Sequence, residues 1–86
     1  MRSLKELRQA VDAVDREIVA ALLRRFEITD EIGRVKRATG VAAVRNEARE
    51  REVLERVGPD CAEVYRAIMA EAVRREERYF EAGDSQ

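Results

Sequence analysis

Two cationic side chains, Arg25 and Lys36, are spaced so that they could hold one small anion between them. They lie eleven residues apart in the sequence, which is close to three full turns of an α-helix, so on a helix both would project from nearly the same face. Their backbones would be about 16 Å apart along the helix axis, a gap that two long side chains can close. The pair therefore predicts a site for a small dianion.

Arg25 and Glu76 are charged residues at positions where the surrounding pattern calls for apolar ones. A charge inside a helical bundle is costly unless it is compensated, so each inward charge needs a reason. One explanation is structural: an ion pair between helices, which could join Arg25 to Glu76 itself. The other explanation is an anion-binding cavity inside the bundle. The remaining charges are expected to form a solvated surface with weak pairs.

The element that must carry both cations is a long helix over residues 4–39. Ser3 and Glu6 have the spacing of a capping box at its start, and Gly40 is a suitable terminator. Between these ends, apolar residues recur in alternating steps of three and four, which is the heptad pattern of a coiled coil. The seam consists of Leu4, Leu7, Val11, Val14, Ile18, Ala21, Ile28, Ile32 and Val35.

The length of this helix predicts a dimer. The helix would be on the order of 54 Å long, whereas a compact chain of this size has a radius of gyration of roughly 12 Å. It would therefore protrude, and its apolar seam would need another chain to cover it. Arg8 lies about 25 Å from Arg25 along the same helix, so it could reach the anion site only from an antiparallel partner chain.

Two shorter helices complete the expected all-α chain. A connection over residues 40–45 leads to a second helix of about 46–57, capped by Asn46, and to a third of about 60–81, capped by Asp60. Glycine and proline are scarce, at four and one residues, which favours helix throughout. The apolar face of the second helix is expected to be Ala48, Val53, Leu54 and Val57, and the inward stripe of the third Cys61, Val64, Tyr65, Ile68, Ala72, Glu76 and Tyr79.

The composition argues against several classes of function. The 86 residues are expected to form a single domain over 1–86. Seventeen basic and eighteen acidic residues leave a net charge of −1, which argues against nucleic-acid binding. The absence of histidine and the single cysteine argue against a zinc site and exclude an internal disulfide. No segment is apolar enough for a membrane span or a secretory signal, so a cytoplasmic protein is expected.

Several short motifs, taken in order, resemble the all-α (AroQ-type) chorismate mutases. These motifs are Leu7-Arg8, Val11-Asp12, Val14-Asp15, Leu22-Leu23-Arg24-Arg25, Ile32-Gly33-Arg34-Val35-Lys36 and Arg49-Glu50. The likeness is good over residues 4–57 and weaker from residue 60 onward. It implies an isomerase of the shikimate pathway that converts chorismate to prephenate for phenylalanine and tyrosine synthesis. It also implies an intertwined homodimer of three-helix chains that uses no cofactor and no metal.

The resemblance also implies a role for each matching residue. Arg8 would enter from the partner chain and bind one substrate carboxylate, and Arg25 would bind the other. Lys36 would donate to the ether oxygen and to a carboxylate. Arg49 would support the carboxylate end of the substrate, and Glu50 would accept a hydrogen bond from the ring hydroxyl. Such a site would catalyse the reaction without a nucleophile or a proton-shuttling histidine.

Three positions depart from the common pattern of the family. Glu76 stands where many members have a glutamine that donates to the ether oxygen, and a glutamate can donate only when it is protonated. Ala72 stands where a serine is common, so one hydrogen bond to the substrate is lost. Asn46 stands where an aspartate is frequent, which changes how the substituent at ring carbon 4 is recognised.

These departures leave alternatives open. One is a mutase for 4-amino-4-deoxychorismate in secondary metabolism, and a less favoured one is an isochorismate-pyruvate lyase of the same fold. A different class is a non-catalytic helical dimer or adaptor, in which Arg25 would serve only a structural pair. The resemblance is also compatible with activation by a partner enzyme.

Overall fold

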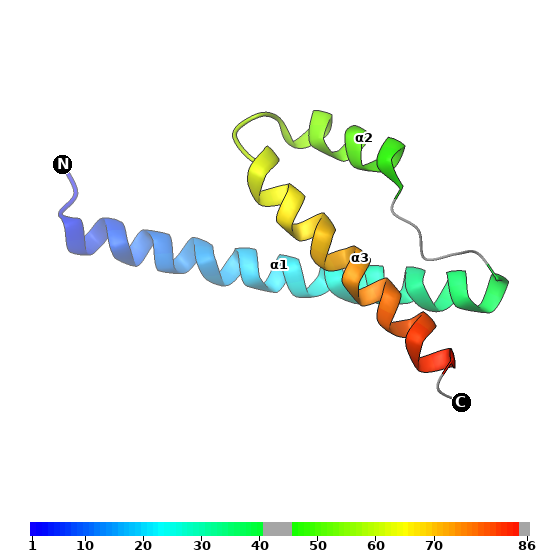
Figure 1. The fold of residues 1–86 in the computed structure, drawn as a ribbon. Helices are drawn as coiled ribbons and strands as arrows, with labels where there is room; N and C mark the ends of the chain where they lie inside the picture. The colour runs from blue at the N-terminus through cyan, green and yellow to red at the C-terminus, as the bar shows by residue number, and fades with distance from the viewer. Residues whose placement is uncertain (41–45, 85–86) are drawn as a thin grey trace.

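The chain forms three α-helices, and the computed structural model describes residues 1–40 and 46–84. The helices are α1 (Leu4–Thr39), α2 (Glu47–Val57) and α3 (Ala62–Asp84), and the described ranges contain no strand. α1 runs along the whole length of the molecule, α3 crosses its C-terminal half, and α2 packs against α3 (Figure 1). The all-α class with a very long first helix is thus confirmed. Apart from Gly40, the predicted connection over 40–45 lies outside the described residues.

Both ends of α1 are capped as the sequence predicted. At the start, the Ser3 hydroxyl accepts a hydrogen bond from the Glu6 backbone N–H at 3.1 Å, and the Glu6 carboxylate accepts one from the Ser3 N–H at 3.4 Å. At the end, Gly40 adopts a left-handed conformation with φ of 75°, and its N–H donates to carbonyls of the last turn. The helix therefore continues without interruption for 36 residues and holds its side chains at fixed relative positions.

α2 is a short helix with a defined cap at each end. The Asn46 side-chain oxygen accepts a hydrogen bond from the Arg49 N–H at 3.0 Å, so the predicted N-cap is confirmed. At the other end, Gly58 has a φ of 84°, and its N–H donates to the Leu54 carbonyl at 3.1 Å. A side chain would be strained at that φ, which explains why glycine terminates α2.

The expectation that Asp60 caps the third helix is wrong. α3 begins at Ala62, and the Cys61 N–H donates to the Gly58 carbonyl at 3.3 Å, closing a turn that contains Asp60. Cys61 occupies the cap position instead, because its carbonyl accepts the first helical hydrogen bond from the Tyr65 N–H at 2.9 Å. The residues that the sequence analysis assigned to the start of the helix belong instead to the turn that follows Gly58.

The predicted apolar faces of α2 and α3 are wrong at three residues. Ala48 and Cys61 are exposed, and Val64 is 62% exposed. Because α3 starts away from α1 and then crosses it at an angle (Figure 1), its first turn does not face α1. Among the described residues, the buried apolar side chains are Val53 of α2, as predicted, and Met69 of α3, which was not predicted.

The single chain is elongated and leaves much apolar surface uncovered. Its radius of gyration is 16.8 Å and its extents are 58 × 28 × 14 Å, well beyond the roughly 12 Å of a compact chain of this length. The N-terminal half of α1 extends past the other two helices (Figure 1). Large exposed side chains along the α1 seam are Leu4, Leu7, Val11, Val14, Ile18, Ile28, Ile32 and Val35.

Gly33 of α1 lies at a close contact between α1 and α3. A Cβ atom there would stand 2.9 Å from Cδ2 of Tyr79 and 3.3 Å from Cα of Glu76. The second contact is with backbone, which cannot move aside by rotating a side chain. The absence of a side chain at Gly33 thus sets the distance between the helices next to Glu76.

We expect Gly33→Ala to lower the free energy of unfolding by about 1–3 kcal/mol, because the extra methyl group must push α3 outward. Urea unfolding measures this change. In an unobstructed helix, the same substitution would stabilise the protein by about 1 kcal/mol. A gain in stability would therefore contradict the close packing at this position.

Candidate active site

A cavity of about 460 Å³ opens between the three helices, a size that suits a small organic ligand. α1 contributes Arg25, Ile28, Thr29, Ile32 and Lys36 to its lining. The start of α2 contributes Asn46, Arg49, Glu50 and Val53, and α3 contributes Met69, Ala72, Val73 and Glu76. All three helices are therefore needed to form it.

The structure brings together most of the side chains that the sequence analysis singled out. Seven of them line this one cavity: Arg25, Lys36, Asn46, Arg49, Glu50, Ala72 and Glu76. The eighth, Arg8, is exposed in the N-terminal half of α1 and does not belong to the lining. Within one chain, Arg8 and the cavity are separate.

Lys36 and Glu76, which both line the cavity, form an ion pair between α1 and α3. The Lys36 Nζ atom lies 3.0 Å from Oε1 of Glu76, and the two side chains are 25% and 11% exposed. The suggested structural pair between Arg25 and Glu76 is therefore corrected, since Glu76 pairs with Lys36. The cause is the helix crossing, because the close approach at Gly33 brings this part of α3 against the last turns of α1.

Arg25 is held in a different way. Its guanidinium lies over the ring of Tyr65, 5.7 Å from the ring centroid, and none of the ion pairs between described residues includes it. Its backbone carbonyl accepts a hydrogen bond from the buried Thr29 hydroxyl at 2.9 Å. The positive charge of Arg25 thus faces the cavity without a carboxylate of the described chain at ion-pair distance.

The start of α2 supplies polar groups to the third wall. The Arg49 guanidinium lies 3.1 Å from a Glu52 carboxylate oxygen, but both side chains are more than half exposed. Such a pair is worth little in water, so Arg49 can turn toward an anion at small cost. Glu50 is half-buried and places a carboxylate on the same wall. The cavity lining therefore has cations on two helices and the carboxylate of Glu50 as an acceptor.

Two buried lining residues were missed by the sequence analysis. Met69 is 6% exposed and Thr29 is 7% exposed, and both lie against the cavity. Met69 precedes Glu76 by seven residues, or two helical turns, so that spacing could have identified it. Thr29 likewise precedes Lys36 by seven residues, so the same spacing could have identified it, and its hydroxyl donates to the Arg25 carbonyl of its own helix.

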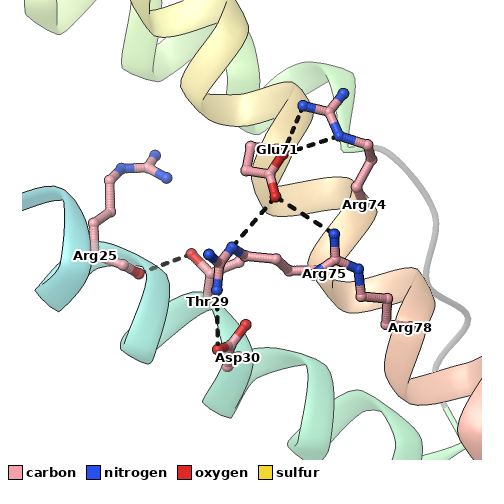
Figure 2. A network of polar contacts seen from close by, with 7 residues as sticks. All are labelled: Arg25, Thr29, Asp30, Glu71, Arg74, Arg75 and Arg78. Carbon is pink, nitrogen blue, oxygen red and sulfur yellow. Dashed lines mark hydrogen bonds and ion pairs between the residues drawn. The ribbon is translucent and has the colours of Figure 1, made fainter.

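A second polar cluster ties α3 to α1 on another face (Figure 2). Arg75 lies 3.4 Å from Asp30 and 3.5 Å from Glu71, and its guanidinium covers the Phe26 ring at 4.2 Å. The hydrogen bond from Arg74, helped by neighbouring guanidinium charges, holds the pKa of Glu71 below its usual value. Figure 2 shows the Arg25 guanidinium apart from this cluster, with no contact drawn to its side chains.

Residues 1–40 and 46–84 contain no group of three or more side chains of the kinds that hold a metal ion. No helix in the same ranges is long and apolar enough to cross a membrane.

The fold and the cavity define a class: a three-helix chain whose long first helix presents two cations to a small ligand site. This chain belongs to the chorismate mutase type II family, whose profile matches residues 7–77. It is also similar to a T-protein of Haemophilus influenzae, with 36% identity over 53 residues. That match covers 62% of this chain but only 13% of the relative. No solved structure matches the chain.

Proposed function

We propose that this domain converts chorismate to prephenate by a [3,3]-sigmatropic rearrangement. The observation that carries the proposal is the cavity itself, where Arg25, Lys36 and Arg49 converge from two helices. Chorismate is a dicarboxylate, so its two negative charges match this set of cations. Family membership over residues 7–77 supports the same reaction.

The chemistry explains why the cavity needs no nucleophile. The rearrangement is unimolecular and requires the flexible substrate to be held in a compact, chair-like conformer. As the C–O bond breaks, negative charge grows on the ether oxygen, and fixed positive charge near that atom lowers the barrier. Only interactions that strengthen in the transition state raise the rate of the chemical step.

Each charged group then has a distinct task. Arg25 binds one carboxylate of the substrate, and Arg49 supports the carboxylate end from α2. Lys36 donates to the ether oxygen and to a carboxylate. Glu50 accepts a hydrogen bond from the ring hydroxyl. This division places the cations where the substrate is anionic and a carboxylate where the substrate has a hydrogen-bond donor.

Glu76 is placed to complete the ether-oxygen site. Its carboxyl lies beside Lys36 at 3.0 Å and can donate to the ether oxygen only in its protonated form. We expect Glu76→Gln, whose amide always carries N–H donors, to raise kcat above that of the wild type. Steady-state kinetics of both proteins under the same conditions measure the change. An equal or lower kcat in the variant would contradict donation by Glu76.

The second part of the proposal is an antiparallel homodimer. The exposed α1 seam supplies an apolar surface that a second copy can cover with the same residues, as a two-fold symmetric interface requires. In that arrangement, Arg8 of one chain reaches the cavity of its partner and binds the second carboxylate. Each cavity would then be completed in trans.

Mixing two inactive variants tests this arrangement. Arg8→Ala and Arg25→Leu should each be nearly inactive alone. After co-refolding at equal amounts, half of the dimers are mixed, and each mixed dimer has one intact site, so about a quarter of the sites should recover. No recovery, despite mixed dimers detected by mass spectrometry, would contradict a trans role for Arg8.

The direct assay follows the loss of chorismate by ultraviolet absorbance and identifies the product by chromatography. We expect saturable formation of prephenate. Turnover of 4-amino-4-deoxychorismate or isochorismate in place of chorismate would redirect the proposal within the same cavity. No turnover of any of the three would contradict catalysis and favour a helical adaptor.

A further inference from the structure

We propose that Tyr65 is a positioning residue that holds the Arg25 guanidinium toward the substrate. Tyr65 lies near the start of α3, is half-buried and does not line the cavity itself. It therefore acts through Arg25 and not on the substrate. The proposal rests on the proposed function, because it assigns a binding task to Arg25.

The geometry of the contact leaves the donors of Arg25 available. The guanidinium carbon lies over the Tyr65 ring, 5.7 Å from its centroid, within the range of a cation–π interaction. In such a contact the ring attracts the cation electrostatically and occupies none of its N–H donors. The N–H groups of a guanidinium can still form a fork with a carboxylate.

The contrast with the other cations of the cavity supports this assignment. Lys36 is paired with Glu76 at 3.0 Å and Arg49 with Glu52 at 3.1 Å. A carboxylate partner holds a cation in place but also offsets the charge that the substrate must meet. An aromatic partner holds Arg25 and leaves its full positive charge for the ligand.

Backbone hydrogen bonds anchor the helical turns that carry Tyr65 and Arg25. The Tyr65 N–H donates to the Cys61 carbonyl at 2.9 Å, which starts α3 directly after the turn at Gly58. On the opposite side, Thr29 binds the Arg25 carbonyl within α1. The ring and the guanidinium thus meet between two well-anchored helices.

Substitutions of Tyr65 test the proposal. Tyr65→Phe keeps the aromatic face, whereas Tyr65→Leu and Tyr65→Met keep bulk and apolar character without it. We expect the Leu and Met variants to raise KM by about fivefold, the effect of losing one cation–π contact, with kcat within about twofold of the wild type. The Phe variant should match the wild type. Arg34→Met breaks a similar contact with Tyr79 outside the cavity and should leave KM unchanged.

A second readout needs no substrate. The ring current of Tyr65 should shift the side-chain proton resonances of Arg25 in NMR spectra. These shifts should be retained in Tyr65→Phe and lost in the Leu and Met variants.

The outcomes separate the two proposals. If the wild type shows no turnover, the proposed function fails, while the NMR shifts still decide whether Tyr65 holds Arg25. If the wild type is active but KM is unchanged in the folded Leu and Met variants, the positioning role is overturned. Equal losses in the Phe and Leu variants would overturn it as well, because the hydroxyl and not the ring face would then matter.

Discussion

Replacing Arg25 by leucine is expected to abolish turnover and leave the three-helix fold intact. The guanidinium is the cavity cation whose described contact is an aromatic ring, and a bound substrate carboxylate would lose its main partner there. Truncating one side of a desolvated charge pair costs about 2–5 kcal/mol, so kcat/KM should fall by about a thousandfold. Steady-state kinetics and circular dichroism measure the two effects together.

The stability of the same variant distinguishes the enzyme from an adaptor. An inward arginine without a carboxylate partner is costly, so leucine should preserve or raise the melting temperature. Arg24→Leu, on the exposed neighbouring position of α1, serves as the matched control and should retain activity. If Arg25→Leu unfolds the protein, Arg25 serves the architecture and its assignment to substrate binding is wrong.

Replacing Lys36 by glutamine is expected to have the second largest effect. Glutamine can still donate a hydrogen bond, but it offers no full charge to the ether oxygen as negative charge develops there. Removing one such transition-state donor costs about a hundred- to thousandfold in kcat. The change in KM should be much smaller, because the interaction strengthens mainly in the transition state.

The pairing between Lys36 and Glu76 provides the control for this variant. Lys36→Gln leaves the nearly buried Glu76 carboxylate without its cation at 3.0 Å, so the melting temperature should also fall. Adding Glu76→Gln to the same chain should restore stability but not kcat. Arg37→Gln, on the exposed adjacent position, should change neither quantity. A double variant that regains full activity would show that the charge of Lys36 is dispensable.

The parts of the fold that depend on local chemistry could be predicted from the sequence. The capping box at Ser3 and the left-handed Gly40 follow from single residues and their immediate neighbours. The shared face of Arg25 and Lys36 follows from helical periodicity alone, and both side chains do line one cavity. Where one helix sets the geometry, residue spacing was sufficient.

The parts that depend on how helices cross could not be predicted. The partner of Glu76 was misjudged because the crossing at Gly33 selects Lys36 over Arg25. Burial of Met69 in place of Val64 has the same origin, since the angle between α3 and α1 decides which face is inward. A helical pattern identifies a stripe, but only the crossing angle shows where along the stripe contact begins.

The uncovered seam of α1 also makes the stability of the fold depend on protein concentration. One uninterrupted helix carries Arg25, Lys36 and the exposed apolar residues, so in the proposed homodimer the second copy would cover the seam and stabilise the same helix that lines the cavity. By mass action, the midpoint of unfolding should then rise with protein concentration. Dilution alone would loosen the helix, and the abundance of the chain in its environment would set how much of it is competent to bind a ligand.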